Sequence, residues 1–157
     1  MEICFWVIGK TNAPYLKEGE SEYLKRIPHY TKFSYQQWPD IKRSKKMGVE
    51  ETKKQEGDLI LSKLVSSDVL VLLDEKGKTF SSEAWAGQLQ KWMNASPRRL
   101  IFVVGGAFGF SQEVYQRAQS KVALSSMTFS HQMVRVIFLE QLYRGFSILN
   151  NEPYHHT

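Results

Sequence analysis

The chain has 157 residues, 42% of them hydrophobic and 24% charged, which predicts one globular domain spanning residues 1–157. The single cysteine, Cys4, excludes a disulfide framework and a cysteine metal cluster, and favours a reducing, cytoplasmic setting. The N-terminus lacks the basic segment of a signal peptide, and no run approaches the roughly 20 apolar residues of a membrane span. The net charge of +5 is a moderate bias towards polyanionic partners.

Basic residues gather in the middle of the chain, at Lys42, Arg43, Lys45, Lys46, Lys53 and Lys54. Two interpretations stay open. The cluster is either a solvated loop and helix face, or a patch that contacts phosphates and binds more weakly as salt rises.

The first half of the chain alternates strand-like and helix-like patterns. Residues 3–8 are apolar at every position, as expected for a strand covered on both faces. A helix is predicted over 14–27, with Asn12 as its cap and Pro28 at its end. A strand over 33–38, a basic linker over 39–48 and a helix over 49–66 follow.

The second half repeats the alternation. A strand over 69–73 is predicted to end at Asp74 and a turn over 75–78, and Ser81 and Ser82 then cap a helix. Strands over 100–104 and 121–124 and helices over 111–119 and 132–149 complete the chain. This order predicts an α/β fold with a mostly parallel sheet flanked by helices.

Three loops follow strands of this second half, at 73–78, 105–111 and 125–131. Ligands of parallel sheets gather at the carboxyl ends of strands, so one pocket is expected there. The loop GGAFGF at 105–110 fits either a tight turn or the close approach of a ligand to backbone. Its spacing matches neither the dinucleotide fingerprint nor the Walker loop.

The last helix is apolar on nearly every side, which predicts that a second copy covers it in a homodimer. Its Glu140 and Arg144 are spaced to pair with each other, and Arg144 pointing into a site is the equal alternative. The histidines His155 and His156 lie in a tail expected to be disordered. A tag remnant and a metal pair are the alternatives, and no third metal ligand is evident.

Several motifs, in this order, together resemble one family over nearly the whole chain. They are Leu73-Asp74 with Gly77-Lys78, Gly105-Gly106 with Gly109, LSSMTFSHQMVRV from Leu124, LEQLYRGF from Leu139 and the terminal PYHH. The chain resembles the RlmH family, bacterial SPOUT-class methyltransferases that act on N3 of a pseudouridine in large-subunit 23S ribosomal RNA. Gly9-Lys10, residues 22–26 and residues 54–57 also fit the family.

The resemblance implies a SPOUT fold with a C-terminal trefoil knot, a homodimer, and S-adenosylmethionine bound in the knot without a metal. The cofactor-binding residues that it implies are Leu73, Gly105, Leu124, Ser125, Ser126, Met127, Thr128 and Phe129. Backbone groups of such loops pair with an adenine edge while apolar side chains enclose the ring.

Methyl transfer to a ring nitrogen requires in-line positioning and removal of the N3 proton. The catalytic candidates are His131, Arg144, Tyr154 and His155, with His131 equally fitted to a structural role at the helix start. Two positions depart from the family: Ser130 replaces its usual proline, and His156 stands where lysine or arginine is common.

Three alternatives compete with a ribosomal RNA methyltransferase. One is a non-enzymatic RNA- or ribosome-binding module on an inactive knot, which the basic cluster would suit equally. An α/β enzyme using another nucleotide is disfavoured by the absence of both phosphate-loop patterns. A metal hydrolase built on the adjacent tail histidines is the least favoured, since adjacent side chains diverge.

Overall fold

A computed structural model describes residues 1–41 and 47–156, and it contains one five-stranded sheet. The strands are β1 (Glu2–Ile8), β2 (Lys32–Trp38), β3 (Val69–Lys78), β4 (Arg99–Val104) and β5 (Ser120–Val122), in the spatial order β2-β1-β4-β3-β5. All the paired strands run parallel, which confirms the predicted α/β class. Four of the basic residues singled out above, at positions 42, 43, 45 and 46, lie outside the described residues.

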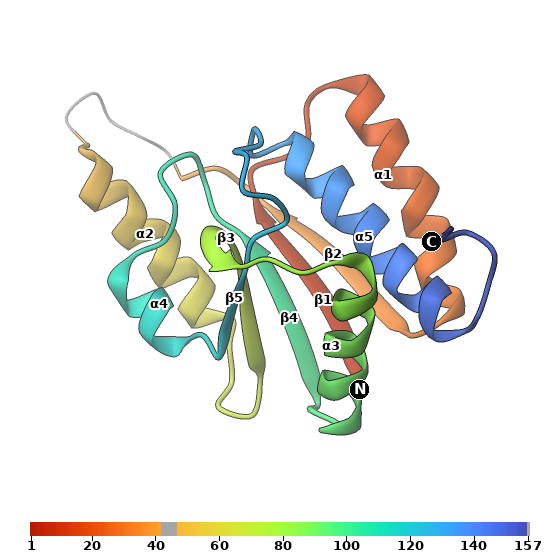
Figure 1. Cartoon of the computed structure of the whole chain (residues 1–157). Helices are drawn as coiled ribbons and strands as arrows, with labels where there is room; N and C mark the ends of the chain where they lie inside the picture. The colour runs from red at the N-terminus through yellow and green to blue at the C-terminus, as the bar shows by residue number, and fades with distance from the viewer. Residues whose placement is uncertain (42–46, 157) are drawn as a thin grey trace.

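Helices cover both faces of the sheet (Figure 1). They are α1 (Pro14–Arg26), the 3-10 helix η1 (Ile27–His29), α2 (Val49–Ser62), α3 (Ser82–Asn94), α4 (Gln112–Arg117) and α5 (Met133–Leu149). One core packs a face of the sheet against α3 and α5, and a second core packs the other face against α2 and α4. Phe5 belongs to the first core and Trp6 to the second, which explains why β1 is apolar at every position.

Several predicted boundaries shift. Ala13, not Asn12, precedes α1 as its cap, and the Asn12 N–H instead donates to Gln132 Oε1 at 2.9 Å. The helix over 49–66 ends already at Ser62, and the strand over 121–124 ends at Val122. Ser81 caps α3 as predicted, because its hydroxyl accepts a hydrogen bond from the Ala84 N–H.

The predicted turn over 75–78 is wrong, because β3 continues to Lys78 and pairs again with β5 after a register shift. The Lys78 carbonyl accepts a hydrogen bond from the Ala123 N–H at 2.9 Å. A Cβ on Gly77 would lie 2.6 Å from backbone atoms of Lys121 and Val122, so only glycine lets the two segments cross this closely.

Helix α5 is covered within a single chain, which removes the argument that its apolar sides demand a partner. It lies between α1 and α3 over the sheet (Figure 1), and none of its residues is exposed. Phe138, Leu139 and Leu142 are fully buried against the sheet. The homodimer stays a prediction and needs other support.

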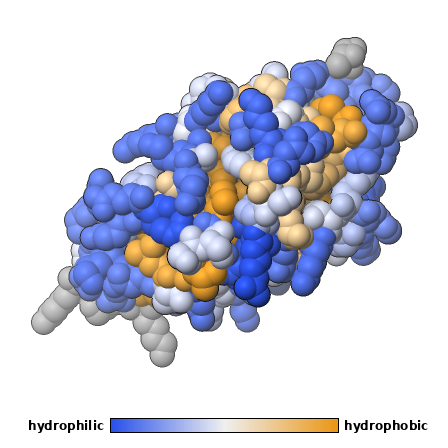
Figure 2. Space-filling model, turned by 90° about the horizontal axis from the view of Figure 1, so that it is seen from below, coloured by the Kyte–Doolittle hydropathy of each residue, from blue (hydrophilic) through white to orange (hydrophobic). Residues whose placement is uncertain are grey.

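Figure 2 views the end of the molecule where the strands begin, and hydrophilic side chains cover most of this face, with smaller apolar areas between them. The loops predicted to form a pocket lie at the opposite edge of the sheet (Figure 1). Within the described part of the chain, no helix is both long and apolar enough to span a membrane.

Candidate functional site

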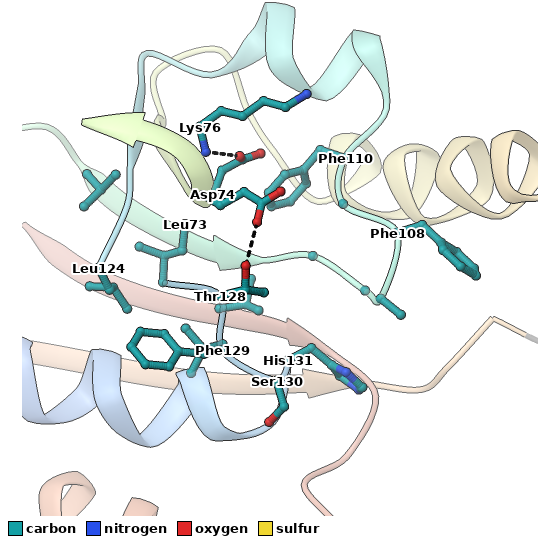
Figure 3. A pocket seen from close by; sticks show the side chains of 18 of the residues that line it. Leu73, Asp74, Lys76, Phe108, Phe110, Leu124, Thr128, Phe129, Ser130 and His131 are labelled. Atoms are coloured by element: carbon teal, nitrogen blue, oxygen red, sulfur yellow. Dashed lines mark hydrogen bonds between the residues drawn. The ribbon is translucent and has the colours of Figure 1, made fainter. Parts of the chain in front are cut away.

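The three predicted loops meet in one cavity of about 540 Å³ at the carboxyl ends of β3, β4 and β5 (Figure 3). Segments 73–76, 104–110 and 122–131 line it, together with Lys53, Tyr115 and Val134. The sequence prediction of a single pocket built from these loops is therefore confirmed. The size suits a small-molecule ligand.

One wall of the cavity is neutral. Of the eight residues implied to bind a cofactor, seven line the cavity: Leu73, Gly105, Leu124, Ser125, Met127, Thr128 and Phe129. Ser126 does not line it. The Ser125 hydroxyl accepts a hydrogen bond from the Met127 N–H at 2.9 Å, which holds the loop in a local turn.

The glycine loop requires glycine for its turn, and its position is compatible with the close approach of a ligand. Gly109 has a φ of +84°, a conformation that side chains disfavour, so the turn itself requires it. Gly106 lies against the carboxylate of Glu56, which occupies the space that a Cβ would need. Gly105 and Gly106 both line the cavity, so a ligand there meets backbone without intervening side chains.

The opposite wall carries charge. Lys53 comes from α2, and Asp74, Glu75 and Lys76 come from the extended end of β3. Asp74 accepts hydrogen bonds from the Lys76 N–H at 2.8 Å and from the Tyr115 hydroxyl. Burial and then the Asp74 carboxylate raise the pKa of Tyr115, so the phenol stays a donor. Glu75 Oε2 accepts a hydrogen bond from the Thr128 hydroxyl at 3.1 Å.

The sequence reasoning did not identify Lys53 or Tyr115 as cavity residues. Lys53 belongs to α2, which lies on one face of the sheet, far in sequence from the three loops. The helical periodicity indicates on which face of α2 Lys53 lies, but it does not indicate which loop packs against that face. Tyr115 lies on α4, directly after the glycine loop, and its proximity to that loop was the only signal available.

His131 lies at the rim of the cavity, at the start of α5 (Figure 3). Its carbonyl accepts a hydrogen bond from Nε of Arg135 at 3.1 Å. The fully buried Arg135 guanidinium also donates to the carbonyls of Gly9 at 2.8 Å and Ile8 at 2.9 Å. This guanidinium therefore ties the loop at 125–131 to the end of β1. Ser130, in place of the family's proline, accepts a hydrogen bond from the Met133 N–H at 3.1 Å and so holds the helix start.

The other catalytic candidates form a cluster at the far end of α5. Arg144 donates to Glu140 Oε1 from Nη2 at 2.5 Å, and its Nη1 lies 3.0 Å from Nδ1 of His155. The Tyr154 hydroxyl donates to the same Glu140 oxygen at 3.1 Å, and its ring lies 4.8 Å from the Arg144 guanidinium. The predicted pairing of Arg144 with Glu140 is confirmed. The alternative that Arg144 points into a site stays a prediction, and in this structure Arg144 contacts the tail.

The charges of this cluster shift its pKa values. The hydrogen bond to Glu140 raises the pKa of Arg144, so the guanidinium stays charged. Burial, then the hydrogen bond with Tyr23 and the charge of Glu140, raise the pKa of Tyr154.

The expected disorder of the tail is wrong, since residues 150–156 fold back onto the chain. The Glu152 N–H donates to the Ser147 carbonyl at 3.0 Å, and the Tyr30 hydroxyl donates to the Glu152 carboxylate at 2.5 Å. His155 Nε2 lies 3.1 Å from Oε1 of Glu83. Within the described part of the chain, no group of three or more metal-ligating side chains is arranged to hold a metal ion.

The two groups of predicted site residues lie at opposite ends of α5. Arg144 follows His131 by 13 positions, which at a rise of 1.5 Å per residue is ~20 Å along the helix. Arg144, Tyr154 and His155 are absent from the lining of the cavity. Within one chain, therefore, the tail cluster lies apart from the cavity.

Comparisons with known proteins agree with the geometry. The sequence profile of a family described as "Predicted SPOUT methyltransferase" matches residues 1–155. A protein of Flavobacterium johnsoniae called "Ribosomal RNA large subunit methyltransferase H" is 54% identical over 156 residues, which cover 99% of each chain. Proteins of the same name from Parabacteroides distasonis and Porphyromonas gingivalis are 53% and 44% identical over the same length and shares. The chain therefore belongs to the SPOUT methyltransferase family, in the RlmH group that its motifs resemble.

Proposed function

We propose that this protein is an S-adenosylmethionine-dependent methyltransferase that modifies N3 of a pseudouridine in large-subunit 23S ribosomal RNA. The observation that carries the proposal is the cavity, which gathers seven of the eight residues implied to bind the cofactor at one edge of the sheet. Relatives named as ribosomal RNA large subunit methyltransferases match the chain from end to end. A ribosomal substrate places the enzyme in the cytoplasm.

The cavity fits S-adenosylmethionine, which supplies an already activated methyl group. Leu73, Met127 and Phe129 offer apolar surface for the adenine ring, and Gly105 offers backbone. The knot implied by the fold would be tied where the end of β3 crosses β5 at Gly77. The neutral wall and the close backbone crossing both support this cofactor.

We propose further that the active site is shared between two copies in a homodimer. The tail cluster lies ~20 Å along α5 from the cavity of its own chain. A catalytic group must come within hydrogen-bond reach of the proton that it moves, so this separation is too great within one chain. A second copy that brings its own tail cluster to the cavity completes the site.

The tail cluster contains the groups that the reaction needs. The His155 imidazole accepts the N3 proton, and the Arg144 guanidinium, whose Nη1 lies 3.0 Å from His155 Nδ1, stabilises the negative charge left on the ring. Tyr154, beside Arg144, stacks on the target base. His131 at the cavity rim orients the start of α5, where its carbonyl is bound by Arg135. No metal is needed, because the methyl group is already activated.

Transfer of a labelled methyl group tests the proposal. The protein is incubated with labelled S-adenosylmethionine and stripped ribosomal RNA, isolated large subunits or assembled ribosomes. We expect label in 23S RNA, with assembled ribosomes as the best substrate, because the described chain has no separate RNA-binding extension. A non-enzymatic binding module would bind the same ribosomes and transfer no label.

Ligand binding provides a second test that does not depend on the RNA. S-adenosylhomocysteine at about 100 times its Kd should stabilise the folded state by about 2.7 kcal/mol. Thermal denaturation measures this as an increase in Tm. No increase at millimolar ligand would contradict the cofactor assignment.

A further inference from the structure

Among the residues that the structure describes, the formal charges that line the cavity all lie on the wall formed by α2 and the end of β3. Two are cationic, Lys53 and Lys76, and two are anionic, Asp74 and Glu75. Asp74 and Lys76 lie across the cavity from Phe129, Ser130 and His131 (Figure 3). The cavity is thus divided into a neutral side and a side with balanced charge.

Three of these four charges retain binding capacity. Among the described residues, no carboxylate lies within ion-pair distance of the Lys76 ammonium. The Lys53 side chain is only 24% exposed, and its partner Glu50, at 3.6 Å, is 88% exposed, so that pair is weak. Within the described part of the chain, Glu75 accepts a side-chain hydrogen bond only at Oε2, from the Thr128 hydroxyl.

Asp74 has a different role. Both of its oxygens are bound within the chain, one by the Lys76 N–H and one by the Tyr115 hydroxyl. It fixes the backbone of the segment from which Glu75 and Lys76 project. Asp74 is therefore a positioning residue.

We propose that Lys53, Glu75 and Lys76 form a subsite for a zwitterionic α-amino acid group, the amino-acid end of the methyl donor. The lysine ammonium groups bind its carboxylate, and the Glu75 carboxylate binds its ammonium. This subsite rests on the proposed function, since the neutral wall opposite must hold the adenosine. A ligand that spans the cavity then meets neutral groups at one end and balanced charges at the other.

A phosphate of the RNA is the other anion that these lysines would suit. Two observations favour the amino acid. The described residues of the wall include as many carboxylates as ammonium groups, and Glu75 would repel a polyanion. Lys53 is also only 24% exposed, so its ammonium is more accessible to a small ligand inside the cavity than to an RNA backbone outside it.

Calorimetric titration of the full-length protein with two ligands tests the subsite. S-adenosylhomocysteine carries the amino acid group, and 5′-methylthioadenosine lacks it but keeps the adenosine. The variants are Lys53→Met, Lys76→Met and Glu75→Gln, the last of which keeps an acceptor for Thr128. Lys54→Met is the matched control, because Lys54 lies on the same helix but pairs with Asp58 in solvent at 3.1 Å.

We expect each of the three variants to raise the Kd for S-adenosylhomocysteine by about fivefold. The Kd for methylthioadenosine should stay within about twofold of the wild-type value. Lys54→Met should change neither. Equal affinity of the wild-type protein for both ligands, or equal weakening of both in the variants, would overturn the subsite while leaving the cofactor assignment in place. If the wild-type protein binds neither ligand, the proposed function fails as well.

Ribosome kinetics separate the two sources of an anion. If Lys53→Met and Lys76→Met leave S-adenosylhomocysteine affinity unchanged and raise only the KM for ribosomes, the lysines contact RNA and the subsite is refuted. Circular dichroism confirms that each variant folds, and methylthioadenosine binding shows that its cavity is intact.

Discussion

The separation of the cavity from the tail cluster predicts that two inactive variants restore each other. Ser125→Trp places an indole in a cavity of about 540 Å³ and blocks the cofactor. Arg144→Ala removes the guanidinium that binds Glu140 and the tail, and leaves the cavity untouched. Each variant alone should be inactive, the first without cofactor binding and the second with it.

The magnitude follows from the geometry. Because Arg144 lies ~20 Å along α5 from His131, a shared site takes its cavity from one copy and its tail cluster from the other. In an equal mixture that exchanges freely, about half of the dimers combine the two variants, and each has one intact site out of two. The mixture should therefore recover about a quarter of the wild-type rate.

The assay is transfer of labelled methyl groups to ribosomes, with native mass spectrometry to count the mixed dimers. A mixture of Arg144→Ala with Tyr154→Ala is the control, because both changes lie in the tail cluster and no mixed dimer has an intact site. If mixed dimers of Ser125→Trp and Arg144→Ala form and remain inactive, the shared site is refuted.

Three further predictions concern the framework of the site. Arg135→Met should lower the free energy of unfolding in urea by about 3 kcal/mol, because three backbone carbonyls lose their donor at about 1 kcal/mol each. Gly106→Ala should raise the Kd for S-adenosylhomocysteine, measured by calorimetry, because its methyl group overlaps the Glu56 carboxylate beneath the loop. Burial alone would raise the pKa of Asp68, but the hydrogen bonds from Arg99 and a backbone N–H outweigh it and lower this pKa below its ordinary 3.8. The stabilisation that the Asp68 carboxylate provides is therefore fully present above pH 3.8 and is lost as the pH falls through the lower pKa of the folded state. Asp68→Asn should lower the free energy of unfolding by about 3 kcal/mol at pH 7, and by progressively less towards pH 3, as measured by urea denaturation at each pH.

Much of the cavity could be predicted from the sequence, for a physical reason. A strand that is apolar at every position must be covered on both faces, and parallel strands bring their carboxyl ends to one edge. Those two rules place Leu73, Gly105 and the loop after Leu124 together, as the structure confirms. A glycine with a positive φ was also predictable somewhere in the loop at 105–111, and the structure shows that it is Gly109.

Other features required the tertiary structure. The extension of β3 past Asp74 depends on pairing with β5, which lies more than forty residues later. The charged wall depends on how α2 packs beside the end of β3, and the periodicity of α2 does not specify that contact. The tail was predicted to be disordered because the residues that order it, Tyr30, Glu83 and Arg144, are distant from it in the sequence.

The sequence by itself determined the α/β class and the three loops of the cavity, because hydrophobic periodicity and turn chemistry are local properties of the chain. The family came from the resemblance of its motifs, taken in order along the chain, to known methyltransferases. Only the tertiary structure decided that α5 is covered within one chain and that it separates the cavity from Arg144. Both depend on how segments distant in sequence pack together. The argument for a homodimer therefore no longer rests on the apolar surface of α5. It rests on the distance of ~20 Å along α5 between the cavity and the tail cluster of one chain.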